Sequence, residues 1–582
     1  MLSLAKSLSV VGFVSVVDSC SNIIVSPGAS ADSSSMVAYN ADSGSLFGSL
    51  YHYAAADHEN DEMRDIYDWD SGEYLGQIKE AKHTYNVVGN MNEFGLSIGE
   101  TTYGGVEELQ HQEGAKIDYG SLIWVTLQRS KTAREAVTTI GELMDTYGYA
   151  SEGESFSIAD PSEAWVMEII GKGNYGKGSV WVARKIPDGY VCAHANQARI
   201  TTFPLSDPET CLYSHDVISF ARDIGLYGSD AADEDFSFSD VYDAVTFSGA
   251  RFCEARVWSF FGDIMGKEWA DQYEDYAMGY NLTNRMPLWV KPPQKVSLKD
   301  TFRHMRNHYE DTAMDMDGEQ FSDVGASFSY TPVRSHPLTW TSGGKEYLNE
   351  RPIATQQTGW NFVAQSRKWM PDELSGLLWF GVDDSSTTVR FPVYGSAKQV
   401  PEGFAGAGAQ DGVTPPLMTF DMQSAFSVFN LVANWAYSRW DLMYPVVLNR
   451  IEMYEDKYIK EAQEMDMQAL SEYEKAGATA AVDMVTQFSV SAGNSLVKEW
   501  ANFFGELFVT YRDGYVITES PTENSCGCSV ESGPYSQQWY DRIVEDTGDH
   551  YLVVDDEATL RAGLKRPSLA PVSKKELLKR RY

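Results

Sequence analysis

The stretch Cys20–Val25, Cys-Ser-Asn-Ile-Ile-Val, is the one around which the rest of the chain is organised. The three β-branched residues that end it favour an extended strand. Residues 26–35 are rich in Ser, with Pro, Gly and Asp, as in a turn, and an apolar run resumes at Met36–Tyr39. The pattern predicts two strands joined by a turn, with Asp42 at the end of the second strand. An aspartate there is either a turn former or a carboxylate close to Cys20.

The nineteen residues before Cys20 are typical of a removable leader. Lys6 precedes a mostly apolar run from Leu8 to Val17, and a small-residue end reaches Ser19. This pattern is that of a secretory signal, and the run is too short to span a membrane. A short propeptide, or a first strand that is never removed, are the alternatives. Signal-peptidase cleavage after Ser19 exposes Cys20 in one step, and autocatalytic release of a propeptide has the same result.

A cysteine that becomes the first residue of a chain carries its own base. Its α-amino group has a pKa of roughly 7.7–8.0, so near neutral pH a useful fraction can accept the thiol proton. The thiolate, rather than the thiol, attacks a carbonyl carbon. Leader removal therefore predicts an N-terminal-nucleophile hydrolase with Cys20 as nucleophile, and Asp42 is placed to orient the new amine.

The composition is that of a globular protein, with 43% hydrophobic, 22% charged and 13% aromatic residues. At roughly 150 residues per domain, the length predicts two to four domains. A formal net charge of -37 argues against partners that need a basic surface, namely nucleic acids and anionic membranes. After the leader, no segment has the ~20 consecutive apolar residues of a membrane-spanning helix.

Six cysteines occur without the spacing of a zinc site: Cys20, Cys192, Cys211, Cys253, Cys526 and Cys528. Neither a metal nor an organic cofactor is predicted. If Cys20 is a free nucleophile, the other five cannot all pair within one chain. Cys526 and Cys528 stand too close for an ordinary disulfide with each other, so a bond from either needs another partner and the pairing stays open.

The middle of the chain combines strand patterns with one helical pattern. Residues 85–98 predict two strands and an Asn/Gly turn containing Asn92, whose amide either donates to an oxyanion or tolerates a left-handed backbone. Helical periodicity follows at 119–148, and strand patterns return at 155–192. A helix between runs of strands, without regular βαβ alternation, predicts a layered α+β fold.

The remainder predicts loops, a hairpin and long helices. Residues 265–350 show few clear periods and are expected to form loops over the site, while Gly381–Ser386 and Arg390–Tyr394 predict a late hairpin. A helical period from Met422 to about Tyr511 predicts two or three long helices packed on the sheets or on another subunit. The expected division is a leader at 1–19, a main domain at 20–420, a helical extension at 421–516 and a tail segment at 517–582.

Several motifs occur in the order found in one known family, over a region from Cys20 to about Val516. They are Cys20-Ser-Asn-Ile-Ile, Gly89-x-Met-Asn-Glu-x-Gly-Leu96, Ile158-Ala-Asp-Pro-x-Glu-Ala-Trp165, Val180-Trp-Val-Ala183, Pro187-Asp-Gly189, Ala195-Asn-Gln-Ala-Arg-Ile200, Leu377-Leu-Trp-Phe-Gly-Val382 and Arg390-Phe-Pro-Val-Tyr-Gly395. Together they resemble the cysteine-type dipeptidase family that contains the bacterial dipeptidase A enzymes and the secernins. The resemblance implies an N-terminal-nucleophile hydrolase fold, a four-layer αββα sandwich, with a C-terminal helical extension.

The resemblance also implies roles for five residues. Cys20 is the nucleophile with its own amine as base, and Asp42 holds that amine. Asn92 supplies an oxyanion donor, and Asn196 lies beside the amine and the reacting carbonyl. In relatives of the acylase type an arginine follows a short apolar run and stabilises the nucleophile. Arg251 is the best match to that arginine here, and its alternative roles are a cation on the helix surface or a member of an ion pair.

One position departs from the family pattern. Tyr39 stands where the relatives often carry an arginine, three residues before the aspartate. The thiol therefore lacks one neighbouring cation that would lower its pKa, and substrate recognition is not expected to follow those relatives closely.

The implied activity is hydrolysis of short peptides, above all dipeptides, through a thioester and without a cofactor. One alternative is an acylase of the same superfamily acting on N-acyl substrates. The other is a non-catalytic, secernin-like protein of exocytosis, which an intact leader would favour. The expected partner is a short-peptide substrate, with no nucleic acid, no membrane after leader removal, and room for a homo-oligomer. The leader predicts the secretory pathway, with secretion or a lysosome- or vacuole-like compartment, and the cytoplasm if it is only a propeptide.

Overall fold

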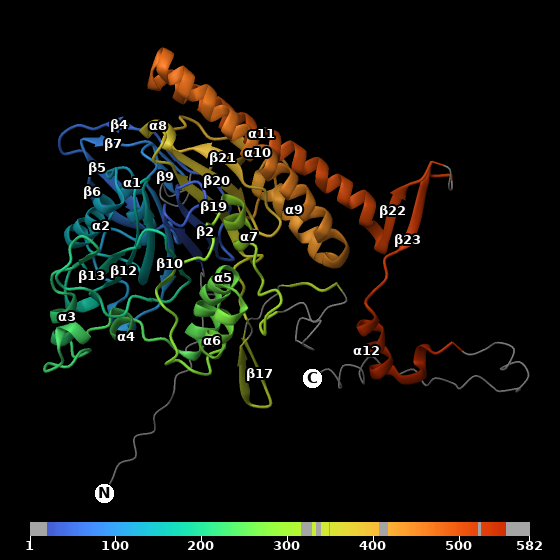
Figure 1. The fold of residues 1–582 in the computed structure, drawn as a ribbon, viewed down its shortest axis with the longest axis horizontal. Coiled ribbons are helices and arrows are strands. Elements are labelled where there is room, and N and C mark those ends of the chain that lie inside the picture. Colours follow the sequence, from blue (N-terminus) through green and yellow to red (C-terminus); the bar gives the residue numbers. More distant parts are fainter. Residues whose placement is uncertain are drawn as a thin grey trace, which may run out of the picture. The chain divides into compact units, whose positions relative to one another are not determined.

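The computed structural model describes residues 20–315, 329–332, 339–348, 350–406, 417–521 and 525–553. The leader predicted at 1–19 lies outside these residues. The chain divides into two units, one up to Ser532 and one from Gly533. The first unit combines helices with two large antiparallel sheets, so its class is α+β, as predicted (Figure 1). None of the described helices is both long and apolar enough to serve as a membrane span.

The first sheet has seven strands and contains the segment that follows Cys20. Its order is β16 (Trp289–Val290), β14 (Val191–His194), β1 (Ser21–Val25), β2 (Ser35–Asp42), β19 (Thr358–Ser366), β20 (Gly376–Val382) and β21 (Phe391–Tyr394). Strands β1 and β2 pair antiparallel, with Asn22 opposite Tyr39. The predicted strand, turn and strand are therefore confirmed, and so is the late hairpin, in β20 and β21. This register brings the strand that carries Tyr39 alongside the start of β1.

The second sheet has eight strands, and its β10 and β11 contact β1 and β2 of the first sheet. Its order is β15 (Cys211–Tyr213), β13 (Ser179–Lys185), β12 (Ala164–Gly171), β11 (Gly153–Ala159), β10 (Ser97–Tyr103), β9 (Met91–Asn92), β8 (Val87–Val88) and β3 (His52–Tyr53). The strands predicted within 85–98 and 155–192 are thereby confirmed. At Gly99 of β10 a Cβ atom would collide with the side chain of Asn22, so glycine permits the close approach of the sheets. The next residue in the strand is Glu100.

Helices α1 (Tyr119–Leu127) and α2 (Ala133–Tyr147) cover the second sheet, where they contact β10 to β13. The helical pattern predicted over 119–148 is confirmed, but it forms two helices rather than one. Thr132 accepts a hydrogen bond from the backbone N–H of Glu135, and the Glu135 side chain bonds back to the cap. This capping box starts a new helix and breaks the periodic stretch in two.

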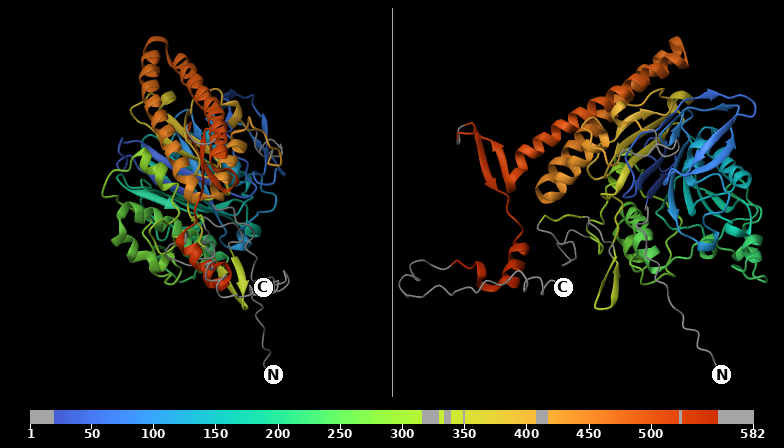
Figure 2. Two further views of the ribbon diagram at one scale, coloured as in Figure 1. Left: turned by 90° about the vertical axis from the view of Figure 1, so that its right-hand side faces the viewer. Right: turned by 180° about the vertical axis from the view of Figure 1, so that it is seen from behind.

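Six helices of the described residues contact the first sheet: α5 (Ala255–Met265), α7 (Leu298–His304), α8 (Asp372–Ser375), α9 (Ala425–Ser438), α10 (Trp440–Ala476) and α11 (Ala478–Tyr511). The last three confirm the helical prediction from Met422 onward, and α10 and α11 run side by side as a long pair (Figure 2). Gly477, with a φ of 87°, reverses the chain between them. Phe429 of α9 stacks on Trp500 of α11, with ring centroids 5.1 Å apart.

The prediction of loops over 265–350 is wrong in part. The described residues of this range include α6 (Lys267–Ala277), α7, β17 (Thr339–Ser342) and β18 (Lys345–Leu348). Acidic residues hide the helical period of α6, yet Trp269 packs edge-on against Phe261 of α5. The shorter elements of the unit are β4 (Ala56–Asp57), β5 (Met63–Tyr67), β6 (Tyr74–Lys79), β7 (His83–Thr84), α3 (Val217–Asp223), α4 (Phe238–Tyr242) and α8 (Asp372–Ser375).

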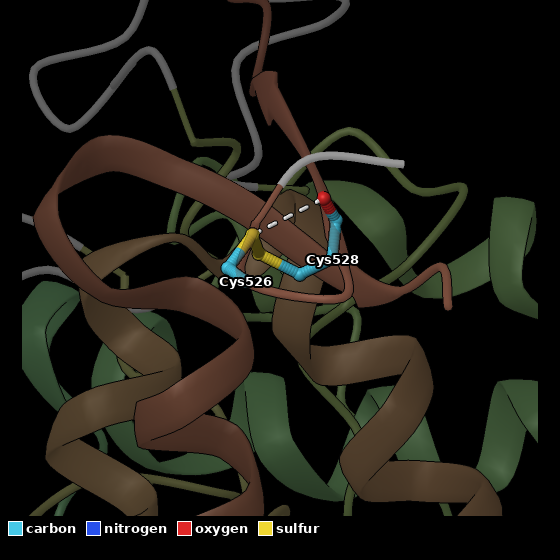
Figure 3. The surroundings of a disulfide bond; sticks show 2 residues. All are labelled: Cys526 and Cys528. Carbon is cyan, nitrogen blue, oxygen red and sulfur yellow. Dashed lines mark hydrogen bonds between the residues drawn. A yellow bond between two sulfur atoms is a disulfide. The ribbon is translucent and has the colours of Figure 1, made fainter. Parts of the chain in front are cut away.

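The hairpin of β22 (Tyr515–Glu519) and β23 (Cys528–Ser532) carries a disulfide near its turn. It joins Cys526 to Cys528, whose Cα atoms are 5.2 Å apart (Figure 3). The expectation that these two cysteines stand too close to pair is therefore wrong. Gly527 between them has a φ of 66°, a left-handed conformation that turns the segment back and brings both side chains together. The other cysteines are thiols: Cys20, Cys192, Cys211 and Cys253.

The described part of the second unit contains the helix α12 (Gln537–Thr547). Its first turn is capped by Ser536, whose side chain accepts from the backbone N–H of Trp539. None of the residues of this helix is buried.

Candidate active site

The thiol of Cys20 lies immediately before β1, and 5% of the residue is exposed. Its Sγ atom is 3.4 Å from the hydroxyl oxygen of Tyr39 and 3.4 Å from Oε1 of Glu100. The hydroxyl of Tyr39 also donates to this carboxylate. Because Tyr39 belongs to β2 and Glu100 to β10, each of the two sheets contributes one contact to the thiol.

A narrow cavity opens onto this thiol. Its lining consists of Cys20, Tyr39, Asp42, Leu46, Trp69, Asp70, Asn90, Glu100, Thr102, Tyr119, Ile123, Trp124 and Trp360. Trp69 and Trp124 stack with ring centroids 4.3 Å apart, and Trp360 lies edge-on to Trp69. The three indole rings give the cavity an apolar wall.

The turn between β5 and β6 supplies Trp69 and Asp70 to the lining. The backbone N–H of Trp69 donates to Asp118, the N-cap residue of α1, at 3.0 Å. Tyr119, the first residue of α1, donates its hydroxyl to Asp70 at 3.0 Å. The start of α1 therefore fixes the turn that forms one side of the cavity.

Burial raises the pKa of the Cys20 thiol well above its ordinary value, and the charges of Glu100 and Asp42 raise it further. Hydrogen bonds from the Tyr39 hydroxyl and the Asp42 backbone act in the opposite direction. The thiol is therefore protonated at neutral pH in these surroundings. Its reaction as a nucleophile needs a nearby base, because only the thiolate attacks efficiently.

Asp42 ends β2 with a fully buried carboxyl group that also lines the cavity. Thr358 donates its hydroxyl to this group at 2.6 Å, and a guanidinium nitrogen of Arg351 lies 3.4 Å away. Burial raises the pKa of Asp42 to about 7, although Arg351 and Thr358 act to lower it. Burial, together with the charge of Arg256, lowers the pKa of Arg351 to about 10.

Arg256 of α5 connects Cys20 to Asn196. Its Nη1 donates to the carbonyl oxygen of Cys20 at 2.6 Å and to the hydroxyl of Ser21 at 2.9 Å. Its Nη2 donates to Oδ1 of Asn196 at 2.9 Å. The amide nitrogen of Asn196 in turn donates to the carbonyl of Thr102, a residue of the cavity lining. The structure thus brings Asn196 close to Cys20 through a buried arginine.

The side chain of Asn92 is not in the cavity lining. Its amide nitrogen donates to the carbonyls of Leu127 and Ser130, each at 2.8 Å. Its Oδ1 accepts from the backbone N–H groups of Phe94 and Leu96. These four bonds use the amide fully, so Asn92 fixes the turn between β9 and β10 and anchors it to the end of α1. Asn90, two residues earlier, lines the cavity.

Arg251 also lies outside the cavity lining. Its guanidinium forms an ion pair with Glu350 and donates to the carbonyl of Met278. The arginine that bonds to Cys20 is Arg256, five residues later in the chain.

A second carboxyl group, that of Glu154 in β11, is hydrogen-bonded to Glu100. Burial and the charge of Glu100 raise the pKa of Glu154 well above its ordinary value. Thr102 donates its hydroxyl to Glu154 at 3.0 Å. The raised pKa favours the protonated form of Glu154, which can then donate to the Glu100 carboxyl group. Among the described residues, no group of three or more His, Cys, Asp or Glu side chains is arranged to bind a metal.

The family model described as peptidase family C69 matches residues 59–452, which is more than half of the chain. The chain belongs to peptidase family C69. The match includes Glu100, Asn196 and Arg256, whereas Cys20 and Asp42 precede it. In this C69 protein the matched region therefore holds some of the groups around the thiol, while the thiol itself, Tyr39 and Asp42 lie before it.

Curated proteins similar to this C69 chain are named dipeptidases. A probable dipeptidase of Salmonella dublin is 24% identical over 408 residues, or 67% of this chain and 84% of that protein. A probable dipeptidase of Latilactobacillus sakei is 23% identical over 317 residues, or 54% of this chain and 58% of that protein. Dipeptidase A of Lactobacillus helveticus is 23% identical over 304 residues, or 52% of this chain and 55% of that protein. The chain spans little more than half the length of the last two.

Three charged residues of this C69 site, Glu100, Arg256 and Arg351, were not predicted from the sequence. Arg256 carries a usable signal, since it stands in the apolar segment Ala255–Phe261, where a charge needs a buried partner. Glu100 also interrupts a buried strand. Arg351 lies between β18 and β19, outside any helix or strand, so no periodic sequence pattern indicates it.

Proposed function

We propose that this chain is a cysteine-type dipeptidase with the N-terminal-nucleophile hydrolase fold, a four-layer αββα sandwich. Two sheets in contact, each with helices packed on it, support this fold. The observation that carries the function is the position of Cys20. This residue directly precedes β1, and its thiol faces a small cavity. Relatives named dipeptidases support a short-peptide substrate.

Removal of residues 1–19 supplies the base that the buried thiol needs. The released α-amino group belongs to Cys20 itself, and its ordinary pKa of roughly 7.7–8.0 suits it to accept the thiol proton. The carboxylate of Asp42 lines the same cavity and stabilises the resulting ammonium group. Arg256 fixes the Cys20 carbonyl, so the terminal residue keeps one orientation after cleavage.

The reaction then proceeds in two stages. The thiolate attacks the carbonyl carbon of the substrate's peptide bond, a C–S bond forms, and the carbonyl electrons move to oxygen. The Cys20 ammonium protonates the leaving nitrogen as the C–N bond breaks, which leaves a thioester and a free amino acid. Water, deprotonated by the same amine, hydrolyses the thioester, restores the thiol and releases the second amino acid.

The oxyanion of each stage needs hydrogen-bond donors in the cavity. The family resemblance gives this role to Asn92, but both amide hydrogens of Asn92 are engaged by carbonyls. We assign the role to Asn90, which lines the cavity and whose amide nitrogen donates one of its two hydrogens to the carbonyl of Ile98 at 2.9 Å. Asn196 is held by its hydrogen bonds to Thr102 and Arg256.

The proposed function is tested with purified protein whose first residue is identified by N-terminal sequencing. Protein that begins at Cys20 is expected to hydrolyse neutral dipeptides, and Cys20→Ala is expected to be inactive with an unchanged circular dichroism spectrum. Hydrolysis by the Cys20→Ala variant at the wild-type rate would refute the mechanism. Hydrolysis of N-acyl amides but of no dipeptide would instead point to an acylase.

The secretory pathway is the proposed location. The leader pattern supports it, and so does the disulfide between Cys526 and Cys528, because such bonds persist in oxidising compartments. We also propose that the protein forms a homo-oligomer whose subunits contact one another through the long helices α9 to α11.

A further inference from the structure

We infer that the carboxylate of Glu100 binds the α-ammonium group of the substrate, and that the enzyme therefore requires peptides with a free amino terminus. This inference rests on the proposed dipeptidase function and specifies the substrate class of the same site. It would separate this protein from hydrolases that act on N-acyl substrates.

Covalent geometry restricts where the ammonium group of a dipeptide can lie. The nitrogen is two bonds from the carbonyl carbon that is attacked, a distance of about 2.5 Å. That carbon approaches the nucleophile to about 3–3.5 Å before reaction. The ammonium nitrogen therefore lies within about 6 Å of the sulfur in a reactive complex. A carboxylate that binds it has to stand next to the nucleophile.

Glu100 meets this requirement. Its Oε1 lies 3.4 Å from Sγ of Cys20, and its side chain lines the cavity. Asp42 also lines the cavity, but Arg351 lies 3.4 Å from it and the proposed mechanism uses it for the enzyme's own amine. Asp70 belongs to the exposed turn between β5 and β6, where it accepts from Tyr119.

Two neighbours orient the carboxyl group of Glu100. The hydroxyl of Tyr39 donates to it, and burial and nearby negative charges raise the pKa of this tyrosine, so that it stays a neutral donor. Glu154 is hydrogen-bonded to Glu100, and burial raises the pKa of Glu154. Among the described residues, no Lys or Arg side chain lines the cavity, whose acidic side chains are Asp42, Asp70 and Glu100.

The tyrosine at position 39 gains a function in this arrangement. An arginine there would add a positive charge beside Glu100, whereas a tyrosine hydroxyl donates a hydrogen bond to the carboxylate without adding a charge. A bound ammonium group would also offset the negative charge that raises the pKa of the Cys20 thiol. A substrate with a free amino terminus would therefore promote formation of the thiolate, and an N-acylated one would not.

The test compares neutral dipeptides with the same dipeptides acetylated at the amino terminus. Mature wild-type enzyme, Glu100→Gln and Asp70→Asn, which changes the other acidic side chain considered for the ammonium site, are assayed for kcat and KM, with circular dichroism to confirm folding. Glutamine keeps the shape of Glu100 and still accepts from Tyr39. We expect wild type to prefer the free dipeptides and Glu100→Gln to raise their KM roughly 10- to 100-fold, the range for loss of a charged hydrogen bond. Asp70→Asn should keep the wild-type preference.

Each outcome decides the inference. Equal cleavage of free and acetylated dipeptides by wild type would overturn it, as would a Glu100→Gln enzyme with wild-type KM. Loss of the preference in Asp70→Asn instead would move the ammonium site to the turn between β5 and β6. If Glu100→Gln does not fold, calorimetric binding of free and acetylated dipeptides to Cys20→Ala decides the question, and equal affinity contradicts the inference. A mature wild type that cleaves neither substrate would refute the proposed function, while the same binding measurement would still test Glu100.

Discussion

Oε1 of Glu100 lies 3.4 Å from Sγ of Cys20, so a carboxylate touches the proposed nucleophile. Such a neighbour opposes catalysis when no cation is present, because it raises the pKa of the thiol. The cavity lining supplies no Lys or Arg side chain among the described residues, and Arg256 reaches the backbone of Cys20 instead. In the proposed mechanism the ammonium group of mature Cys20 supplies a positive charge at this place, and the α-ammonium group of the substrate would supply a second.

Insertion of one alanine between Ser19 and Cys20 tests the need for a terminal amine. The thiol, Glu100 and Asp42 remain, but the amino group then belongs to the alanine or stays in a peptide bond. We expect kcat/KM for dipeptides to fall roughly 10³-fold, the middle of the usual range for loss of a general base. N-terminal sequencing and intact mass establish where each protein begins. Undiminished activity of the extended protein would show that another group acts as base.

Substitution by glutamine compares the catalytic importance of two arginines. Arg256 bonds to Cys20 in the structure, and Arg251 was expected from the sequence to stabilise the nucleophile. Arg256→Gln removes donors to the Cys20 carbonyl and to Asn196, so the terminal residue loses its orientation. We expect kcat to fall roughly 10²-fold, with KM less affected, since misplacement of reacting groups acts mainly on the chemical step. Arg251→Gln breaks an ion pair with Glu350 away from the cavity and should leave kcat within about threefold of wild type. The reverse order of effects would restore the role predicted for Arg251.

Alanine substitutions at Asn90 and Asn92 separate an oxyanion donor from a structural amide. Asn90→Ala should lower kcat roughly 10²- to 10³-fold, as loss of an oxyanion donor does. Asn92→Ala leaves two buried carbonyls and two N–H groups without their partner, which should lower the free energy of unfolding by about 2–4 kcal/mol. Steady-state kinetics and urea unfolding of both variants check this. A stable Asn92→Ala protein with a strongly reduced kcat would return the oxyanion role to Asn92.

The sequence predicts the framework of this protein well and the charged groups of its site poorly, for physical reasons. Strand β1, the late hairpin and the helices α9 to α11 follow from local apolar periodicity, which a single segment carries. The contact between Cys20 and Glu100 depends on how β10 packs against β1, which no segment encodes alone. The choice between Asn90 and Asn92, or between Arg251 and Arg256, depends on which side chain faces the cavity. Local spacing cannot supply that direction in short strands and a π-helical turn.

The pH dependence of stability tests the environment of Asp42. Its pKa is raised from 3.8 to about 7, mainly by burial, so folding favours the protonated carboxyl group. This contribution to stability is complete below about pH 4 and is lost as the pH rises through about 7, by at most about 4 kcal/mol. Asp42→Asn resembles the protonated form and lacks the titration. In protein that retains residues 1–19, we expect the free energy of unfolding of wild type, relative to Asp42→Asn, to decrease between pH 4 and pH 8 in urea titrations. In protein that begins at Cys20, the new ammonium group favours the ionised carboxylate and lowers its pKa, so this decrease should be smaller. If the difference in free energy of unfolding between wild type and Asp42→Asn does not change with pH in either form of the protein, Asp42 titrates near its ordinary pKa. Burial would then not raise the pKa of its carboxyl group.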